Sequence, residues 1–182
     1  MGRYPEEHYR ERKNMPEVKR WLQTVLPIYN IREASAQQQR QDDIDFLGEK
    51  FEGEEVSFEA KIRYKIYPDI LIETISNVTR RTPGWIYVSK ADILVYVFHE
   101  NDRVVRGYLI SLPDLQKWWR KTGTHNDYDI RYGETHSSEK LLYKTKNRVI
   151  PERDIPSQYI IYHPEYGLMN PITDEIDSSY LR

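Results

Sequence analysis

Two acidic residues and a lysine on neighbouring predicted strands have the types and spacing needed to bind a divalent cation and assist phosphodiester hydrolysis. In EEVSFEAKIRY, residues 54–64, polar and apolar residues alternate, which is typical of a half-buried strand. This alternation places Glu59 and Lys61 on one face. Asp45 lies 14 positions before Glu59, in the shorter predicted strand DDIDFLG. A hairpin-like connection would bring the two carboxylates within reach of one cation.

Two carboxylates with open coordination positions suit Mg²⁺, which prefers oxygen ligands, keeps several waters and shares itself with phosphate oxygens. We therefore expect Mg²⁺ as the cofactor, with Mn²⁺ able to substitute for it, and Asp45 and Glu59 as its ligands. Lys61 could orient or help to deprotonate the attacking water, or neutralise charge that develops on the phosphate oxygens. Asp43 shares the predicted strand face of Asp45 and remains an alternative ligand.

Asp45 followed by the triplet Glu59-Ala60-Lys61 resembles the D…E-x-K motif of the PD-(D/E)xK nuclease superfamily, which contains restriction endonucleases, Holliday-junction resolvases and many phage nucleases. The similar region covers about residues 31–121, and TPGWIYVSKADILVYVF is similar to a segment of some phage-type members. The resemblance implies a restriction-endonuclease-like core: a helix, a strand pair that carries the acids, further strands and a flanking helix. It also implies a Mg²⁺-dependent endodeoxyribonuclease.

Three further residues are candidates for completing or tuning the site. Members of the superfamily often add an acid from the preceding helix, and Glu33, 12 positions before Asp45, is the candidate here. Gln37 follows one turn later on the same predicted helix face, and Gln37 or Gln41 could support the metal or the scissile phosphate. Glu73 could be aimed at the same site from a neighbouring strand.

The sequence departs from the superfamily motif at Ile44, where the motif is usually written with proline. A literal Pro68-Asp69 occurs later, with Glu73-Thr74-Ile75 behind it. That alternative lacks the lysine and places both acids on one strand without an intervening hairpin. We therefore prefer the assignment that includes Asp45.

The composition predicts one domain with a heavily charged surface. The 182 residues suffice for one real core, 31% of them are charged, and the net charge is only −2. The absence of cysteine excludes disulfides and thiolate zinc sites and suits a reducing cytoplasm, in a bacterial or phage-infected cell. Because no apolar run is long enough to span a bilayer, we expect no membrane partner.

We expect a single α/β domain with a mixed central β-sheet flanked by helices. Residues 1–30 are expected to form an N-terminal helical extension, broken or restarted near Pro16. Residues 31–121 are expected to form the core, which begins with a helix over residues 31–41, and residues 122–182 to form peripheral C-terminal elements. Strands are expected at residues 68–76, 92–98 and 104–110, and near residues 148–150 and 159–162. The last helix is expected to start after Ser111.

DNA is the expected partner. Arg63 and Lys65 continue the polar side of the predicted strand, and Arg80 and Arg81 lie in a predicted turn, so these four could contact phosphates. A homodimer is left open because paired cuts across a duplex usually need two active sites. The alternatives are a catalytically inert DNA- or protein-binding domain on the same fold, and a nuclease that acts on RNA or branched junctions.

Overall fold

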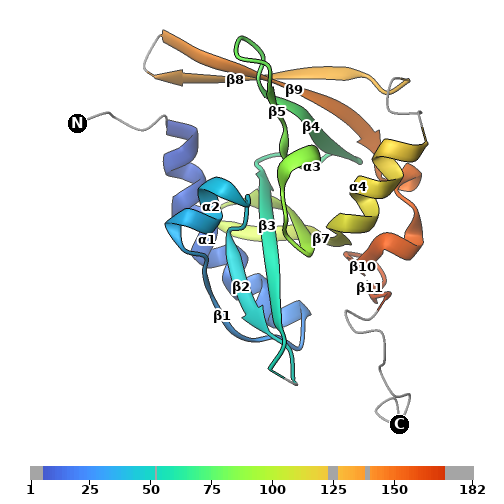
Figure 1. The fold of residues 1–182 in the computed structure, drawn as a ribbon. Coiled ribbons are helices and arrows are strands. Elements are labelled where there is room, and N and C mark those ends of the chain that lie inside the picture. Colours follow the sequence, from blue (N-terminus) through green and yellow to red (C-terminus); the bar gives the residue numbers. More distant parts are fainter. Residues whose placement is uncertain (1–5, 52, 123–126, 138–139, 171–182) are drawn as a thin grey trace.

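The computed structural model describes residues 6–51, 53–122, 127–137 and 140–170. They form a single α/β domain of two sheets flanked by helices, as Figure 1 shows. The central sheet is mixed, as expected, and runs in the order β1 (Tyr29–Glu33), β2 (Phe46–Glu49), β3 (Glu55–Arg63), β6 (Ile93–Glu100), β7 (Arg103–Ser111), β10 (Ile160–His163) and β11 (Gly167–Leu168). The second, antiparallel sheet runs in the order β5 (Thr82–Pro83), β4 (Asp69–Asn77), β9 (Lys140–Pro151) and β8 (Ile130–Ser137).

The helices are α1 (Glu6–Val25), α2 (Ala36–Gln41), α3 (Trp85–Val88) and α4 (Leu112–Lys121), followed by two short 3₁₀ helices at Glu152–Asp154 and Ser157–Tyr159. None of the described helices is both long enough and apolar enough to cross a membrane. In the first sheet, β3 and β6 pair in parallel and the other pairs are antiparallel. The connection between β3 and β6 contains β4, β5 and α3, so the second sheet grows out of this crossover.

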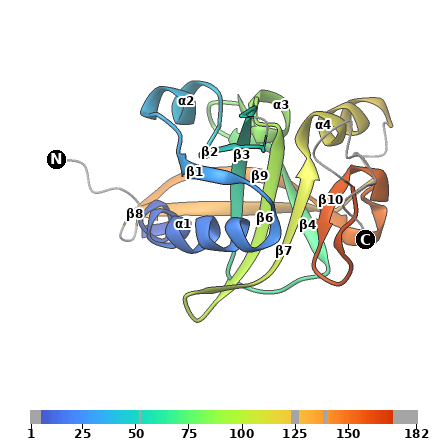
Figure 2. The same ribbon diagram turned by 90° about the horizontal axis from the view of Figure 1, so that it is seen from below.

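Two apolar layers cover the two faces of the first sheet. Figure 2 shows α1 on one side of this sheet and α4 on the other. The layer beneath α1 includes Val18, Leu22, Phe58, Val95 and Leu109. The layer between the first sheet, the second sheet and α4 includes Ile72, Tyr96, Leu115, Trp119 and Ile150. Each layer removes apolar surface from water, at about 25 cal/mol per Å².

The polar face of β3 points into the space between the two sheets. Glu59 aligns with Leu94 and Lys61 with Tyr96 in the parallel pair formed by β3 and β6. Leu94 and Tyr96 both belong to the apolar layer between the sheets. Because aligned residues of neighbouring strands share a face, Glu59 and Lys61 face the second sheet. β3 therefore places its apolar side chains in the layer beneath α1 and its charged side chains, Glu59 and Lys61, in the layer between the two sheets.

The expected helix over residues 31–41 is wrong at its start. Residues up to Glu33 belong to β1, where Ile31 is buried, and the helix begins only after Ser35. Ser35 and Gln38 form a reciprocal capping box at that helix start. The pairing of β1 with β2 prevails over the helix propensity of this segment.

The expected break at Pro16 is also wrong, because α1 continues through this residue. Met15 and Val18, on the two sides of the proline, pack into the same apolar layer and hold both parts of the helix on the sheet.

The C-terminal segment is more central than the sequence suggests. Strand β9 pairs with β4, and β10 pairs with β7, so this segment contributes to both sheets. Ile150, Ile155 and Ile160 are buried in the layer between the sheets. The described part of residues 122–182 is therefore not peripheral.

Candidate active site

Asp45 lies one residue before β2 and opposite Glu59. The β2–β3 ladder pairs Phe46 with Phe58, so the next pair outward is Asp45 with Glu59. The Asp45 amide donates to the Phe58 carbonyl at 2.8 Å, and Asp45 Oδ2 accepts a hydrogen bond from the Ala60 amide at 2.8 Å. A side-chain oxygen thus takes the place of a backbone acceptor at the end of the ladder, which fixes the Asp45 carboxylate beside β3.

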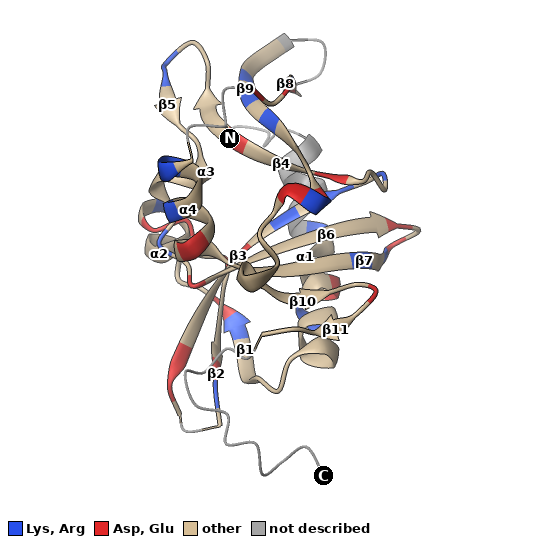
Figure 3. Ribbon diagram, turned by 90° about the vertical axis from the view of Figure 1, so that its right-hand side faces the viewer, with Lys and Arg blue, Asp and Glu red and all other residues tan. Residues whose placement is uncertain are grey.

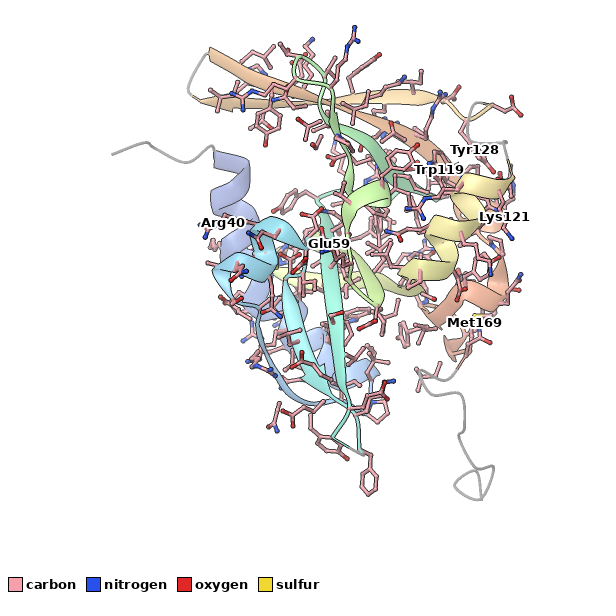
Figure 4. All side chains as sticks on the ribbon, viewed as in Figure 1. Arg40, Glu59, Trp119, Lys121, Tyr128 and Met169 are labelled. Atoms are coloured by element: carbon pink, nitrogen blue, oxygen red, sulfur yellow. The ribbon has the colours of Figure 1, made fainter. Side chains whose placement is uncertain are left out.

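Glu59 and Lys61 form an ion pair through Oε1 and Nζ. Figure 4 shows Glu59 in the interior of the molecule, on β3 and between α2 and α3 in that view. The Glu59 side chain is 4% exposed and the Lys61 side chain 33% exposed. A surface ion pair contributes about 0–1 kcal/mol, but desolvation of a carboxylate costs several kcal/mol. A solvated strand face therefore does not account for Glu59.

Three carboxylates act on the Lys61 ammonium, and a fourth, that of Asp43, acts on Glu59. Burial raises the pKa of Glu59 well above its ordinary value; Lys61 opposes that shift, and Asp45 and Asp43 add to it. Burial alone would lower the pKa of Lys61, but Glu59, Asp45 and Glu73 together raise it well above its ordinary value. Burial and the two neighbouring acids therefore disfavour the ionised form of Glu59, and a proton or a bound cation would relieve this cost.

Asp43 does not lie on a strand face. Its backbone is left-handed, with φ of 53°, a conformation that aspartate tolerates better than most residues. The Asp43 carbonyl accepts a hydrogen bond from Ser89 Oγ at 3.0 Å, and the Asp42 carbonyl accepts one from the Lys90 amide at 2.8 Å. This turn ties the start of β2 to the loop after α3, and it places Asp43 near enough to act electrostatically on Glu59.

Two buried contacts hold β4, the strand that carries Glu73, against the first sheet. Arg63 Nη1 binds both the carboxylate and the main-chain carbonyl of Asp69, the latter at 3.0 Å. Tyr96 Oη accepts a hydrogen bond from the Leu71 amide at 2.9 Å. Burial raises the pKa of Tyr96 to about 12, so the hydroxyl stays protonated. The positioning roles of Asp69 and Tyr96 were not predicted from the sequence, because their contacts form only when β4 packs on the first sheet.

The four residues expected to bind nucleic acid do not lie together. The Arg63 side chain is 11% exposed, and its guanidinium lies 4.4 Å from the centre of the Tyr67 ring, so Arg63 has a structural position. Lys65 is exposed in the connection before β4. Arg80 and Arg81 are exposed in the turn after β4, so the whole length of that strand separates them from Lys65.

Glu33 and Gln37 do not share a helix face. Glu33 is the last residue of β1, and the next amide, that of Ala34, donates to the Asp45 carbonyl at 2.9 Å. Gln37 lies on α2, where its side-chain amide donates to Gln41 Oε1 at 3.1 Å. Both side chains are exposed. Among the described contacts, neither reaches the buried ion pair.

Gly84 gives a test of how closely α3 approaches β4. Its amide donates to the Thr74 carbonyl at 3.0 Å, and a Cβ at this position would overlap the backbone of Glu73. We expect Gly84→Ala to destabilise the fold by about 2–3 kcal/mol, because only a backbone shift can make room. Urea unfolding measures this cost. Gly53→Ala, in an exposed turn with φ of 82° and open space, should cost only about 1 kcal/mol, and equal costs would contradict the close approach.

The described residues include no group of three or more His, Asp or Glu side chains arranged to hold a metal together. Mg²⁺ needs no such group, because one or two carboxylates with water and phosphate oxygens suffice for it. No protein-family model, no curated protein and no solved structure matches the chain. The functional assignment therefore depends on the chemistry of the site itself.

Proposed function

We propose that the protein is a metal-dependent DNA endonuclease, related to the PD-(D/E)xK superfamily, that hydrolyses phosphodiester bonds at Asp45, Glu59 and Lys61. The observation that carries this proposal is the buried Glu59 carboxylate, which contacts Lys61 and lies close enough to two further acids, Asp45 and Asp43, for them to act on it. Asp45 and Asp43 add to the cost of ionising Glu59, and a bound cation would offset that cost. Functional sites are where such costly arrangements concentrate.

The donor set fits Mg²⁺. Asp45 and Glu59 offer hard carboxylate oxygens from adjacent strands, and Asp43 adds negative charge nearby. Mg²⁺ bound there would act as a Lewis acid on the scissile phosphate and help to activate water. The hydrogen bond from the Ala60 amide orients Asp45 before any ligand arrives, which reduces the cost of binding.

The raised pKa of Lys61 favours one of its two expected roles. At neutral pH the side chain is an ammonium, which donates protons and hydrogen bonds and does not accept them. Lys61 would therefore neutralise charge on the phosphate oxygens and hold the attacking water. A group other than Lys61 would act as the base that accepts the proton of this water. Glu73 would keep Lys61 charged and in place. Glu33 and Gln37, which are exposed near Asp45, could contact the substrate only from the rim.

The order of elements supports the same proposal. A helix, the acid-carrying pair β2–β3, further strands and the flanking helix α4 follow one another as the resemblance implies. The second sheet, which joins β4 and β5 from the connection between β3 and β6 to β8 and β9 from the C-terminal segment, belongs to this chain's own architecture. A restriction-endonuclease-like core remains part of the proposal.

Cleavage of supercoiled plasmid DNA tests the function. The purified protein is expected to nick or linearise plasmid with Mg²⁺ or Mn²⁺ and to be inactive in EDTA. Asp45→Asn should slow cleavage by about 10²–10³-fold while leaving the melting temperature nearly unchanged, because the asparagine Oδ1 can still accept from the Ala60 amide. The matched control is Asp129→Asn, an exposed position outside the site. Cleavage by Asp45→Asn at the wild-type rate would refute the proposal.

A catalytically inert DNA-binding domain is the second candidate. The ion pair between Glu59 and Lys61 favours this candidate, because the Lys61 ammonium already binds the carboxylate that a metal would need as a ligand. Calorimetric titration with Mg²⁺ and Mn²⁺ separates the candidates, since the inert domain binds neither ion at this site. RNA and branched-junction substrates in the same cleavage assay test the remaining alternatives.

A further inference from the structure

Strands β8 and β9 form a two-stranded ribbon that extends beyond the rest of the second sheet. β4 pairs with β9 over residues 146–151, whereas β8 pairs with β9 over residues 140–148. Figure 1 shows the ribbon crossing the domain from the α4 side toward the N-terminal end of α1. The outer half of the ribbon therefore has two strands only.

Cationic and aromatic side chains gather on one face of this ribbon. On this face, Tyr132 is paired with Lys146, and Lys144 follows two residues along β9. On the other face, Arg131 is paired with Asn147, and its guanidinium lies 5.3 Å from the centre of the Tyr67 ring. Tyr132 is 55% exposed, and Arg131 is also exposed. The face with Tyr132, Lys144 and Lys146 is therefore the one that can contact an anionic partner.

One face of the ribbon leads to the proposed active site. Asn147 lies between Arg131 on β8 and Glu73 on β4, so the three side chains form a row across three strands. Glu73 in turn acts electrostatically on Lys61. The base of the ribbon, where β9 pairs with β4, therefore lies near the ion pair on β3.

The turn between β4 and β5 adds two arginines to the same end of the sheet. The Val78 amide donates to the Lys144 carbonyl at 2.8 Å, which fixes the turn with Arg80 and Arg81 beside β9. Figure 3 shows basic positions along β9 and at this turn. Lys144 is paired with Glu134, but no ion pair among the described residues involves Arg80, Arg81 or Lys146. Their charges are available to an anionic partner.

We propose that the ribbon binds duplex DNA by entering the major groove, while Arg80 and Arg81 contact the adjacent phosphates. The major groove of B-DNA is about 12 Å wide and admits a two-stranded ribbon. A ribbon in a groove has a phosphate backbone along each edge, and Arg80 and Arg81 lie at one such edge, beside β9. The choice of substrate rests on the proposed function, but the binding can be measured without cleavage.

A second copy of the chain is the competing occupant. β8 is an edge strand, and Ile130, Leu141 and Leu142 are exposed on the ribbon. Edge-to-edge pairing through β8 would leave Lys146 on β9, and Arg80 and Arg81 in the turn beside β9, without an anionic partner among the described residues. The charge distribution therefore favours DNA.

Fluorescence anisotropy with a labelled DNA duplex in EDTA tests the proposal. Each lost phosphate contact lowers the slope of log K against log salt by about 0.9. Combined Arg80→Gln, Arg81→Gln and Lys146→Gln should reduce that slope by about 2–3 and weaken binding by about 10–100-fold. The matched control replaces three exposed cations on α4, Lys117, Arg120 and Lys121, with glutamine. Equal losses in both variants would overturn the proposal.

Two further measurements test the groove. Duplexes with bulky 5-substituents on their pyrimidines, which fill the major groove, should bind at least about 10-fold more weakly than plain DNA. An A-form RNA duplex should also bind weakly, because its major groove is too narrow for a ribbon. Equal binding of all three duplexes would overturn the groove assignment. Sedimentation as a dimer that Leu142→Thr dissociates, without duplex binding, would overturn it in favour of self-association.

The two proposals fail in different ways. Duplex binding that depends on the ribbon, without cleavage in Mg²⁺ or Mn²⁺, would refute the nuclease and support the ribbon. Cleavage that requires Asp45 but is unaffected by the ribbon substitutions would support the nuclease and refute the ribbon.

Discussion

Replacing Glu59 with glutamine is expected to abolish DNA cleavage and, at the same time, to stabilise the fold. Cleavage should fall by at least about 10³-fold, because an amide is a poor ligand for Mg²⁺. Stability at neutral pH should rise by about 1–2 kcal/mol, because the amide removes a buried charge whose ionisation is unfavourable in the folded state. A gain of this size corresponds to a melting temperature higher by about 2–8 °C for a domain of this length.

The pH dependence of that gain follows from the raised pKa of Glu59. Between its ordinary value and the raised value, the folded state holds a proton that the unfolded state has released. Wild-type stability therefore falls as the pH rises through this interval, and the cost is fully present above the folded pKa. Below the ordinary value both states are protonated and the cost is absent. In thermal melts, Glu59→Gln should have a higher melting temperature than wild type at neutral and alkaline pH, and the difference should disappear toward about pH 4.

Glu54→Gln is the matched control for this variant. Glu54 pairs with Lys50 on the exposed turn before β3, and its side chain is 67% exposed. Its replacement should change stability by less than about 1 kcal/mol and leave cleavage intact. If Glu59→Gln lowered the melting temperature instead, Glu59 would be one half of a structural ion pair. Mg²⁺ should raise the melting temperature of wild type but not that of Glu59→Gln, because only wild type retains both carboxylates.

The local part of the site was predictable from the sequence. Alternation over residues 54–64 and the turn at Gly53 together set the register of β2 and β3, because a one-residue slip would expose Phe58. With that register, Asp45 must face Glu59. The structure places them opposite each other and brings Lys61 against Glu59.

The surroundings of the site depend on contacts between distant segments and could not be predicted. Alternation in β3 is typical of a strand with one face in water, but β4 and β9 pack over that face of the first sheet. Burial of Glu59 and the structural position of Arg63 both result from that second sheet. The prediction that Glu33 lies on a helix was wrong for a related reason. Its segment favours helix locally, and pairing with β2 converts it to a strand.

The Lys61 side chain gives the prediction that best separates charge from chemistry. Lys61→Met keeps the length and apolar stem of the side chain but leaves the neighbouring carboxylates without their ammonium. We expect the fold to lose about 2–3 kcal/mol at neutral pH, because breaking a buried pair leaves an uncompensated charge. The loss should shrink at lower pH, where Glu59 takes up a proton, and in Mg²⁺, which supplies the missing positive charge. Urea unfolding at several pH values measures both effects.

Lys61→Arg distinguishes the two roles of that ammonium. Arginine restores the positive charge, so most of the lost stability should return. Its planar guanidinium cannot reproduce the hydrogen-bond geometry of an ammonium, so plasmid cleavage should stay about 10²–10³-fold below wild type in both variants. Lys90→Met, which breaks the more exposed ion pair with Asp42, serves as the control and should cost less than about 1 kcal/mol without loss of activity. Cleavage by Lys61→Met at the wild-type rate would leave the lysine a structural role and remove it from the reaction.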